Sequence, residues 1–122
     1  MLNLDTHILI HALDDTLTPL ERRLLSANPW SISAIVFWEL AKLAQLGRIG
    51  IDMKSAAFSR IFARVHVWPL DIAVCVQSTA LDFDSDPADE IVAATSIVHS
   101  VPLLTRDRRI RRSRLVPLAH GY

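Results

Sequence analysis

Short apolar segments, each followed by a helical pattern, recur along this sequence and limit its fold more than any other feature. The expected strands are residues 2–4, 30–33, 65–68 and 101–105, with 115–116 as a candidate last strand. Strands that are mostly apolar throughout are typical of a sheet covered by helices on both faces. The sequence therefore predicts a three-layer α/β/α domain with a mostly parallel sheet of four or five short strands.

Helix-capping signals divide the segments between these strands. Thr18 and Pro19 begin one expected helix, Asp71 caps another, and Asp86 and Pro87 begin a third. Gly47 is expected to follow the end of a fourth helix as its C-cap. The expected helices are residues 8–13, 19–26, 34–46, 54–64, 72–81 and 87–100, followed by a short arginine-rich helix.

Composition favours one folded domain spanning residues 1–122. Hydrophobic residues make up 51% of the 122 residues, too large a fraction for a disordered chain. Cys75 is the single cysteine and is expected in the core, so no internal disulfide can form and a reducing, cytoplasmic location is favoured. No apolar run approaches the roughly 18 residues of a membrane helix, and no signal peptide is evident.

The charges cancel overall but are unevenly distributed. Thirteen basic and thirteen acidic residues give a net charge of zero, which on its face argues against a nucleic-acid-binding protein. Residues 65–105 contain no Lys or Arg, whereas residues 106–114 hold six arginines and one acid. This asymmetry indicates an electrostatic partner, an internal pairing, or a solvated helix face.

Four acids occupy positions that can converge on one site. Asp5 follows the strand 2–4, and Asp107 follows the strand 101–105. Asp89 lies in the first turn of a helix, and Glu39 lies within the apolar stripe of another. Ligand sites in open α/β sheets lie beyond the carboxyl ends of the strands. Buried carboxylates are costly unless they are paired or bind a cation.

Each of these acids also has a purely structural interpretation. Asp5, Asp89 and Asp107 could cap helices, and Glu39 could pair with Lys42 on a helix surface. Taken together, four carboxylates favour a hard cation with oxygen ligands, so Mg²⁺ or Mn²⁺ is the expected cofactor.

Several other chemistries are disfavoured. Zinc fits poorly, because His7 and His11 have helical spacing but no third nitrogen or sulfur ligand nearby. The sequence has neither a glycine-rich phosphate loop nor a nucleophile elbow. Trp30, Trp38 and Trp68 stand in apolar surroundings and are expected in the core rather than on an RNA-stacking surface.

The motifs around the four acids resemble those of PIN-domain proteins, and more closely those of the VapC-type toxins of bacterial toxin–antitoxin pairs. The matching segments are Leu4-Asp5-Thr6-His7, Ser33-Ala34 with Trp38-Glu39-Leu40-Ala41 and Leu46-Gly47-Arg48, Asp86-Pro87-Ala88-Asp89 with Ile91-Val92-Ala93-Ala94, and Pro102-Leu103-Leu104-Thr105-Arg106-Asp107. These segments follow the family's order and spacing.

The resemblance implies a Mg²⁺- or Mn²⁺-dependent endoribonuclease that acts as a toxin. It further implies an RNA substrate, a homodimer, and a cognate VapB-like antitoxin that covers the acidic site. The metal-binding and catalytic residues would be Asp5, Glu39, Asp89 and Asp107, supported by Thr6 and Thr105, while Asp86 keeps a capping role. Arg106, Arg108, Arg109 and Arg112 are candidates for contacting RNA phosphates, or else for pairing with acidic groups of the antitoxin or of residues 71–90.

One position departs from the family pattern, and other functions stay open. Glu90 stands where relatives often carry a basic residue, which adds a negative charge beside the site. The alternatives are a housekeeping PIN nuclease that processes RNA and a non-catalytic PIN module that binds RNA or protein. A phospho-accepting receiver domain fits poorly, because Asp14 and Asp15 lie in a turn after a helix.

Overall fold

The computed structural model describes residues 1–119, and its strands form one parallel sheet. The strands are β1 (Leu2–Leu4), β2 (Trp30–Ser33), β3 (His66–Trp68) and β4 (Leu103–Leu104), in the spatial order β3-β2-β1-β4. Each neighbouring pair of strands is parallel. In the register of the central strand, Asn3 lies opposite Ser31 on one side and Leu103 on the other.

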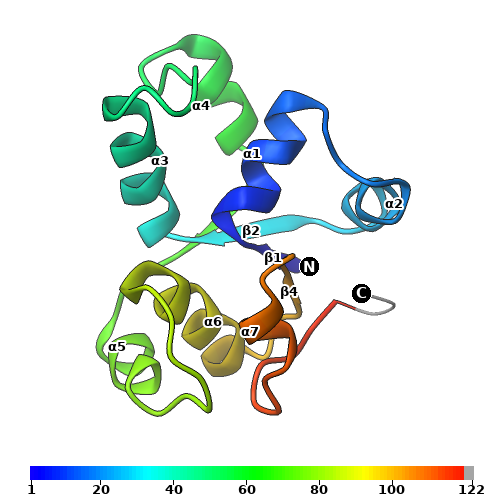
Figure 1. Ribbon diagram of the computed structural model, residues 1–122. Helices are drawn as coiled ribbons and strands as arrows, with labels where there is room; N and C mark the ends of the chain where they lie inside the picture. Colours follow the sequence, from blue (N-terminus) through cyan, green and yellow to red (C-terminus); the bar gives the residue numbers. More distant parts are fainter. Residues whose placement is uncertain (120–122) are drawn as a thin grey trace.

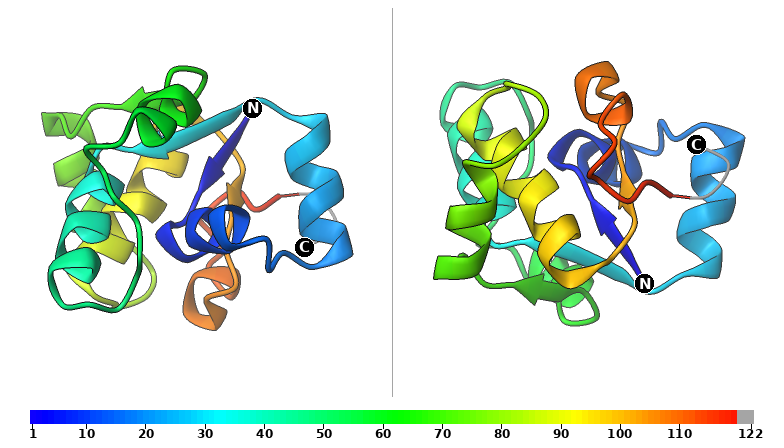
Figure 2. Two further views of the ribbon diagram at one scale, coloured as in Figure 1. Left: turned by 90° about the horizontal axis from the view of Figure 1, so that it is seen from above. Right: turned by 90° about the horizontal axis from the view of Figure 1, so that it is seen from below.

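Helices cover both faces of this sheet. They are α1 (Thr6–Asp14), α2 (Pro19–Ala27), α3 (Ile35–Gln45), α4 (Ala56–Phe62), α5 (Ile72–Ser78), α6 (Pro87–His99) and α7 (Arg108–Arg111). Figure 1 shows α1, α3 and α4 on one side of the sheet and α5 and α6 on the other. Figure 2 shows the first helical layer from above and the second from below. The predicted α/β/α architecture is therefore confirmed.

Local capping chemistry explains where several helices begin and end. Thr18 accepts a hydrogen bond from the backbone of Glu21, whose side chain accepts one from the backbone of Thr18, so α2 begins with a complete capping box. The Asp71 side chain accepts a hydrogen bond from the Val74 N–H at 3.0 Å at the start of α5. Gly47, after α3, has a φ of +70°, in the left-handed region that favours glycine.

The core lies between the sheet and its two helical layers. All three residues of β1 are buried, as are both residues of β4. Ile8 of α1, Ile32 of β2 and Val92 of α6 are fully buried against them. Of the four strands only β4 is wholly apolar, and the buried polar residues of the others are hydrogen-bonded. The Asn3 side chain donates to the Val92 oxygen and the Ser96 hydroxyl, and the Ser31 hydroxyl donates to the Leu2 oxygen. None of the described helices is long and apolar enough to cross a membrane.

The end of the chain differs from the prediction. Residues 115–116 do not form a strand; instead Leu118 makes a parallel bridge with Leu103. The Leu103 N–H donates to the Pro117 oxygen at 2.8 Å, and the Ala119 N–H donates to the Leu103 oxygen at 2.9 Å. The strand expected at 101–105 is also shorter, because Pro102 has no N–H to donate to a ladder.

Helix α5 is likewise shorter than predicted, and it ends at Ser78 rather than near residue 81. The Ser78 hydroxyl donates to the Cys75 oxygen at 2.6 Å, and the Thr79 hydroxyl donates to the Val76 oxygen at 2.7 Å. Hydroxyls that bond to nearby backbone oxygens compete with continued helix formation.

The predicted core positions of two residues were wrong. Cys75 is exposed on α5, and Trp38 on α3 is 55% exposed. Trp30 and Trp68 are partly buried. Local apolar composition indicates a helix but does not tell which of its faces a neighbouring element covers.

Candidate active site

The four predicted acids come from separate elements that meet near the carboxyl ends of the strands. Asp5 joins β1 to α1, and Asp107 lies in the turn between β4 and α7. Glu39 lies in α3, after β2, and Asp89 lies in the first turn of α6. Helices α3 and α6 pack against each other.

Asp5 is the most enclosed of these acids, with 3% of its surface exposed. Its Oδ2 accepts a hydrogen bond from the Thr105 hydroxyl at 2.6 Å. Its Oδ1 is buried and has no hydrogen-bond partner among the described residues. Burial raises the pKa of Asp5, while the bond from Thr105 opposes that increase. Asp5 occupies the N-cap position of α1, but its side chain makes no capping bond to that helix.

Thr105 connects Asp5 to the turn that carries Asp107. While its hydroxyl donates to Asp5, its oxygen accepts a hydrogen bond from the Asp107 N–H at 3.0 Å. Thr105 is fully buried, so these two bonds define its orientation. This hydroxyl therefore occupies the supporting position that was predicted for it.

Glu39 has a comparable partner in Thr6. The Thr6 hydroxyl of α1 donates a hydrogen bond to Glu39 Oε1 of α3 at 2.5 Å. Burial raises the pKa of Glu39, the bond from Thr6 lowers it, and repulsion from Asp5 raises it further. The alternative pairing with Lys42 is not observed among residues 1–119; the Lys42 ammonium instead lies 6.0 Å from the centroid of the Trp38 ring.

Asp89 interacts with all three other acids through its charge. Burial, followed by repulsion from Asp5 and Glu39, raises the pKa of Asp89 to about 6. Asp107 adds a smaller repulsion, and a hydrogen bond at 3.2 Å from the Ser85 hydroxyl opposes these effects. Like charges raise each other's pKa only over short distances, so the structure brings the four predicted acids into one electrostatic cluster.

Asp89 and Asp107 open onto an exposed depression, here called the acidic pocket. It has a volume of about 480 Å³ and is lined by Ser85, Asp86, Asp89, Asp107, Arg108 and Arg109. Asp107 also caps α7, because it accepts hydrogen bonds from the Arg109 and Ile110 N–H groups at 2.8 and 3.2 Å. The capping interpretation of Asp107 is therefore confirmed, and the same residue also lines the acidic pocket.

Two residues near this cluster were assigned other roles from the sequence. Asp86 occupies the expected N-cap position of α6, but its side chain makes no capping bond; it lines the acidic pocket and raises the pKa of Glu39 by repulsion. Its spacing of three residues from Asp89 was the available signal. His7 was considered only as a poorly fitting zinc ligand; it is exposed on α1, and electrostatic attraction from it lowers the pKa of both Asp5 and Glu39.

The arginine candidates separate into different environments. Arg108 and Arg109 line the acidic pocket, and Arg112 lines a neighbouring depression. Arg106 instead directs its guanidinium to Glu21, a buried carboxylate on α2. The sequence did not predict this pairing, because no local pattern indicates that Glu21 and Arg106, 85 residues apart, are in contact.

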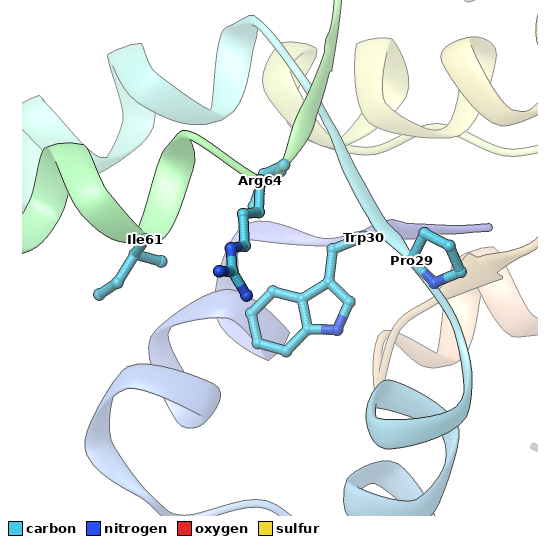
Figure 3. Close-up of a pocket in the computed structure, with 5 residues that line it drawn as sticks. Pro29, Trp30, Ile61 and Arg64 are labelled. Carbon is cyan, nitrogen blue, oxygen red and sulfur yellow. The ribbon is translucent and has the colours of Figure 1, made fainter.

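A second pocket lies at the opposite edge of the sheet, next to the amino ends of β2 and β3. Figure 3 shows its lining side chains, and the full lining is Pro29, Trp30, Ile61, Arg64 and Val65. It has a volume of about 320 Å³ and contains no carboxylate. This pocket therefore has no part in the acidic cluster.

The acids fit a hard divalent cation in donor chemistry and charge. Asp5 offers a buried carboxylate oxygen without a partner, and the mutual repulsion of Asp5, Glu39 and Asp89 would be relieved by a positive ion. Within residues 1–119, no three acidic, histidine or cysteine side chains are already close enough to form a complete metal cluster.

Comparison with known proteins agrees with this architecture. The family model described as "PIN domain" matches residues 3–114. Ribonuclease VapC22 of Mycobacterium tuberculosis (strain ATCC 25618 / H37Rv) is 36% identical over 92 residues, which cover 72% of this chain and 70% of that protein.

Solved structures with the same fold include two toxin–antitoxin complexes. The toxin-antitoxin complex from Klebsiella pneumoniae has a TM-score of 0.71 at 20% identity, with 92% of this chain and 91% of that chain covered. VapBC2 from Rickettsia felis, bound to a DNA fragment from its promoter, has a TM-score of 0.73 at 17% identity, with 98% of each chain covered. Because the family model spans most of the sequence and Ribonuclease VapC22 is 36% identical over more than two thirds of each chain, the chain belongs to the PIN-domain family and is related to the VapC ribonucleases.

Proposed function

We propose that this protein is a divalent-metal-dependent endoribonuclease and the toxin of a toxin–antitoxin pair. Two observations carry the proposal: the charges of Asp5, Glu39 and Asp107 all act on Asp89, and Asp5 Oδ1 is buried without a hydrogen-bond partner among residues 1–119. Similarity to Ribonuclease VapC22 over most of both chains supports RNA as the substrate. Mg²⁺ and Mn²⁺ are the proposed metals because the donors are carboxylate oxygens.

The residues that would hold the metal are Asp5, Glu39, Asp89 and Asp107. A bound Mg²⁺ or Mn²⁺ would make a water molecule more acidic and offset the charge of a phosphodiester. Thr105 and Thr6 orient Asp5 and Glu39 through hydrogen bonds of 2.6 and 2.5 Å. Groups held in place beforehand need no reorganisation during a reaction, so these hydroxyls favour hydrolysis.

Arg108 and Arg109 are the proposed contacts for RNA phosphates. Both are exposed and line the acidic pocket beside Asp89 and Asp107. Guanidinium groups bind phosphate oxygens well, and here they would hold the RNA backbone next to the acids. Arg112 extends the same positive surface into the neighbouring depression.

The decisive experiment replaces Asp5 and expresses the protein alone in bacteria. Asp5→Asn keeps the size of the side chain but removes its charge, so growth arrest and the appearance of new RNA ends should both be lost. Asp14→Asn, which changes an exposed acid at the end of α1, should behave like the wild type. Equal growth arrest and equal RNA cleavage by the wild type and Asp5→Asn would refute the catalytic assignment.

The proposed partners follow from the related structures. The solved neighbours are toxin–antitoxin complexes, so we propose a VapB-like antitoxin that covers the acidic pocket. Co-expression with the product of an adjacent small reading frame should restore growth.

A homodimer is also proposed, and light scattering tests it. Ile72 and Val76 lie one turn apart on α5, 84% and 62% exposed, and are suited to contact a second copy. The proposed location is the cytoplasm.

A further inference from the structure

The turn between β4 and α7 carries two residues of the proposed site on either side of Arg106. Thr105 binds Asp5, and Asp107 lines the acidic pocket. In an extended segment, successive side chains point to opposite sides. Arg106 accordingly makes its contacts with Glu21 of α2 and with the segment before α2, rather than with the four acids of the proposed site.

Arg106 binds Glu21 through two parallel hydrogen bonds. Its Nε donates to Glu21 Oε2 at 2.8 Å, and its Nη2 donates to Oε1 at 2.7 Å. The Glu21 side chain is fully buried, and its Oε1 also accepts a hydrogen bond from the Thr18 N–H at 2.9 Å. A bidentate pair between a guanidinium and a carboxylate fixes both distance and orientation. The start of α2 therefore holds Arg106 in one orientation.

Further contacts bind the same guanidinium. Its Nη2 donates to the Thr16 oxygen at 3.3 Å, and its Nη1 lies 3.0 Å from His11 Nε2. Strand pairing gives the turn little support, because β4 is two residues long and ends at Leu104. The side chain of Arg106 is thus a principal anchor of the segment that presents Thr105 and Asp107.

We propose that Glu21 and Arg106 are positioning residues, which fix the β4–α7 turn so that Thr105 and Asp107 face Asp5 in the geometry needed for metal binding. Neither residue lines the acidic pocket, so neither would touch the metal or the RNA there. The inference rests on the proposed function for its link to catalysis. Its structural part, the ordering of the turn, can be measured without metal or substrate.

The test compares three variants with a matched control. Arg106→Lys keeps the charge but cannot form the two parallel bonds. Arg106→Gln removes the charge. Glu21→Gln with Arg106→Gln removes both charges, so no unpaired ion is left in the core and the fold should survive. Arg23→Lys makes the same change as Arg106→Lys on the exposed face of α2.

Three measurements are made on each protein: hydrogen exchange of the peptide spanning residues 103–110 without metal, Mn²⁺ affinity by calorimetry, and kcat and KM for a model RNA. We expect faster exchange in that peptide, about tenfold weaker Mn²⁺ binding and a reduced kcat with little change in KM. Arg106→Lys should be less impaired than Arg106→Gln, and Arg23→Lys should match the wild type.

The outcomes separate this inference from the proposed function. If the folded variants keep wild-type exchange and Mn²⁺ affinity, the positioning role is wrong whatever the activity. If the wild type does not cleave RNA but the variants show faster exchange and weaker Mn²⁺ binding, the positioning role stands and the ribonuclease proposal fails. A lower melting temperature with unchanged exchange, Mn²⁺ affinity and kcat would indicate a purely structural pair and overturn the inference.

Discussion

The two carboxylate oxygens of Asp5 have different surroundings. One of its oxygens accepts from Thr105, while the other is buried without a partner among the described residues. A buried carboxylate oxygen without a partner lowers the free energy of unfolding, so its presence calls for an explanation such as ligand binding. A cation that binds there would satisfy this oxygen and lower the repulsion that Asp5 exerts on Asp89.

The acidic cluster predicts an unusual dependence of stability on pH in the metal-free protein. Because burial and repulsion raise the pKa of Asp89 to about 6, the folded state retains a proton that the unfolded state has lost above pH about 4. The contribution of Asp89 to the free energy of unfolding therefore falls as pH rises from about 4 to about 6, and the penalty persists at higher pH.

Asp89→Asn removes this penalty because asparagine does not titrate. Comparing the variant with the wild type therefore separates the contribution of Asp89 from that of the other titrating groups. In a chelator, the variant should melt at a higher temperature than the wild type at pH 7.5, with a smaller difference at pH 5. Added Mn²⁺ should stabilise the wild type more than the variant at pH 7.5. Identical differences at both pH values would contradict the placement of Asp89 among like charges.

At the scale of elements, each acid depends on how its helix begins. Pro87 places Asp89 in the first turn of α6, and Asp107 is both the cap of α7 and part of the acidic pocket. The sequence predicted most of these boundaries because capping bonds join residues two or three positions apart. It did not predict that the side chain of Asp86 would make no capping bond to α6 and would line the acidic pocket instead.

The two roles of Asp107 can be separated by two substitutions. Asn is as good an N-cap as Asp, whereas Ala removes the accepting oxygen. Asp107→Ala should therefore lower the free energy of unfolding by about 1 kcal/mol, and Asp107→Asn should change it little. Both variants should lose RNA cleavage, measured with Mn²⁺ on a model RNA. Full activity in Asp107→Asn would remove Asp107 from the proposed metal site.

At the scale of the whole molecule, the charge distribution matters more than the net charge of zero. Acids gather near the carboxyl ends of the strands, and Arg108 and Arg109 lie directly beside them. Metal binding would add positive charge to this region, so RNA binding should weaken in a chelator. A sum over the sequence does not reveal such an arrangement, because it ignores which charges the fold places together.

Replacement of both pocket arginines tests this arrangement. Arg108→Gln with Arg109→Gln should raise KM while leaving kcat nearly unchanged. The slope of the logarithm of the RNA-binding constant against the logarithm of the salt concentration should become less negative by about 1.4. This corresponds to roughly 0.7 for each lost phosphate contact. The control is Arg60→Gln with Arg64→Gln, two arginines that line another depression. It changes the charge equally at the opposite edge of the sheet, where Figure 3 shows Arg64. A larger loss of affinity in the control pair would place the RNA on that edge instead.

The sequence by itself determined the α/β/α fold, most element boundaries and the four acids as candidates. Those features depend on interactions between residues near one another in the chain: apolar strand segments, capping bonds, and an acid directly after a strand. Only the tertiary structure decided that Trp38 and Cys75 are exposed and that Asp86 lines the acidic pocket. It likewise decided that Arg106 pairs with Glu21, 85 residues away. Such contacts join elements that are distant in the sequence. A local pattern cannot specify them, because it contains no information about which faces the fold brings together.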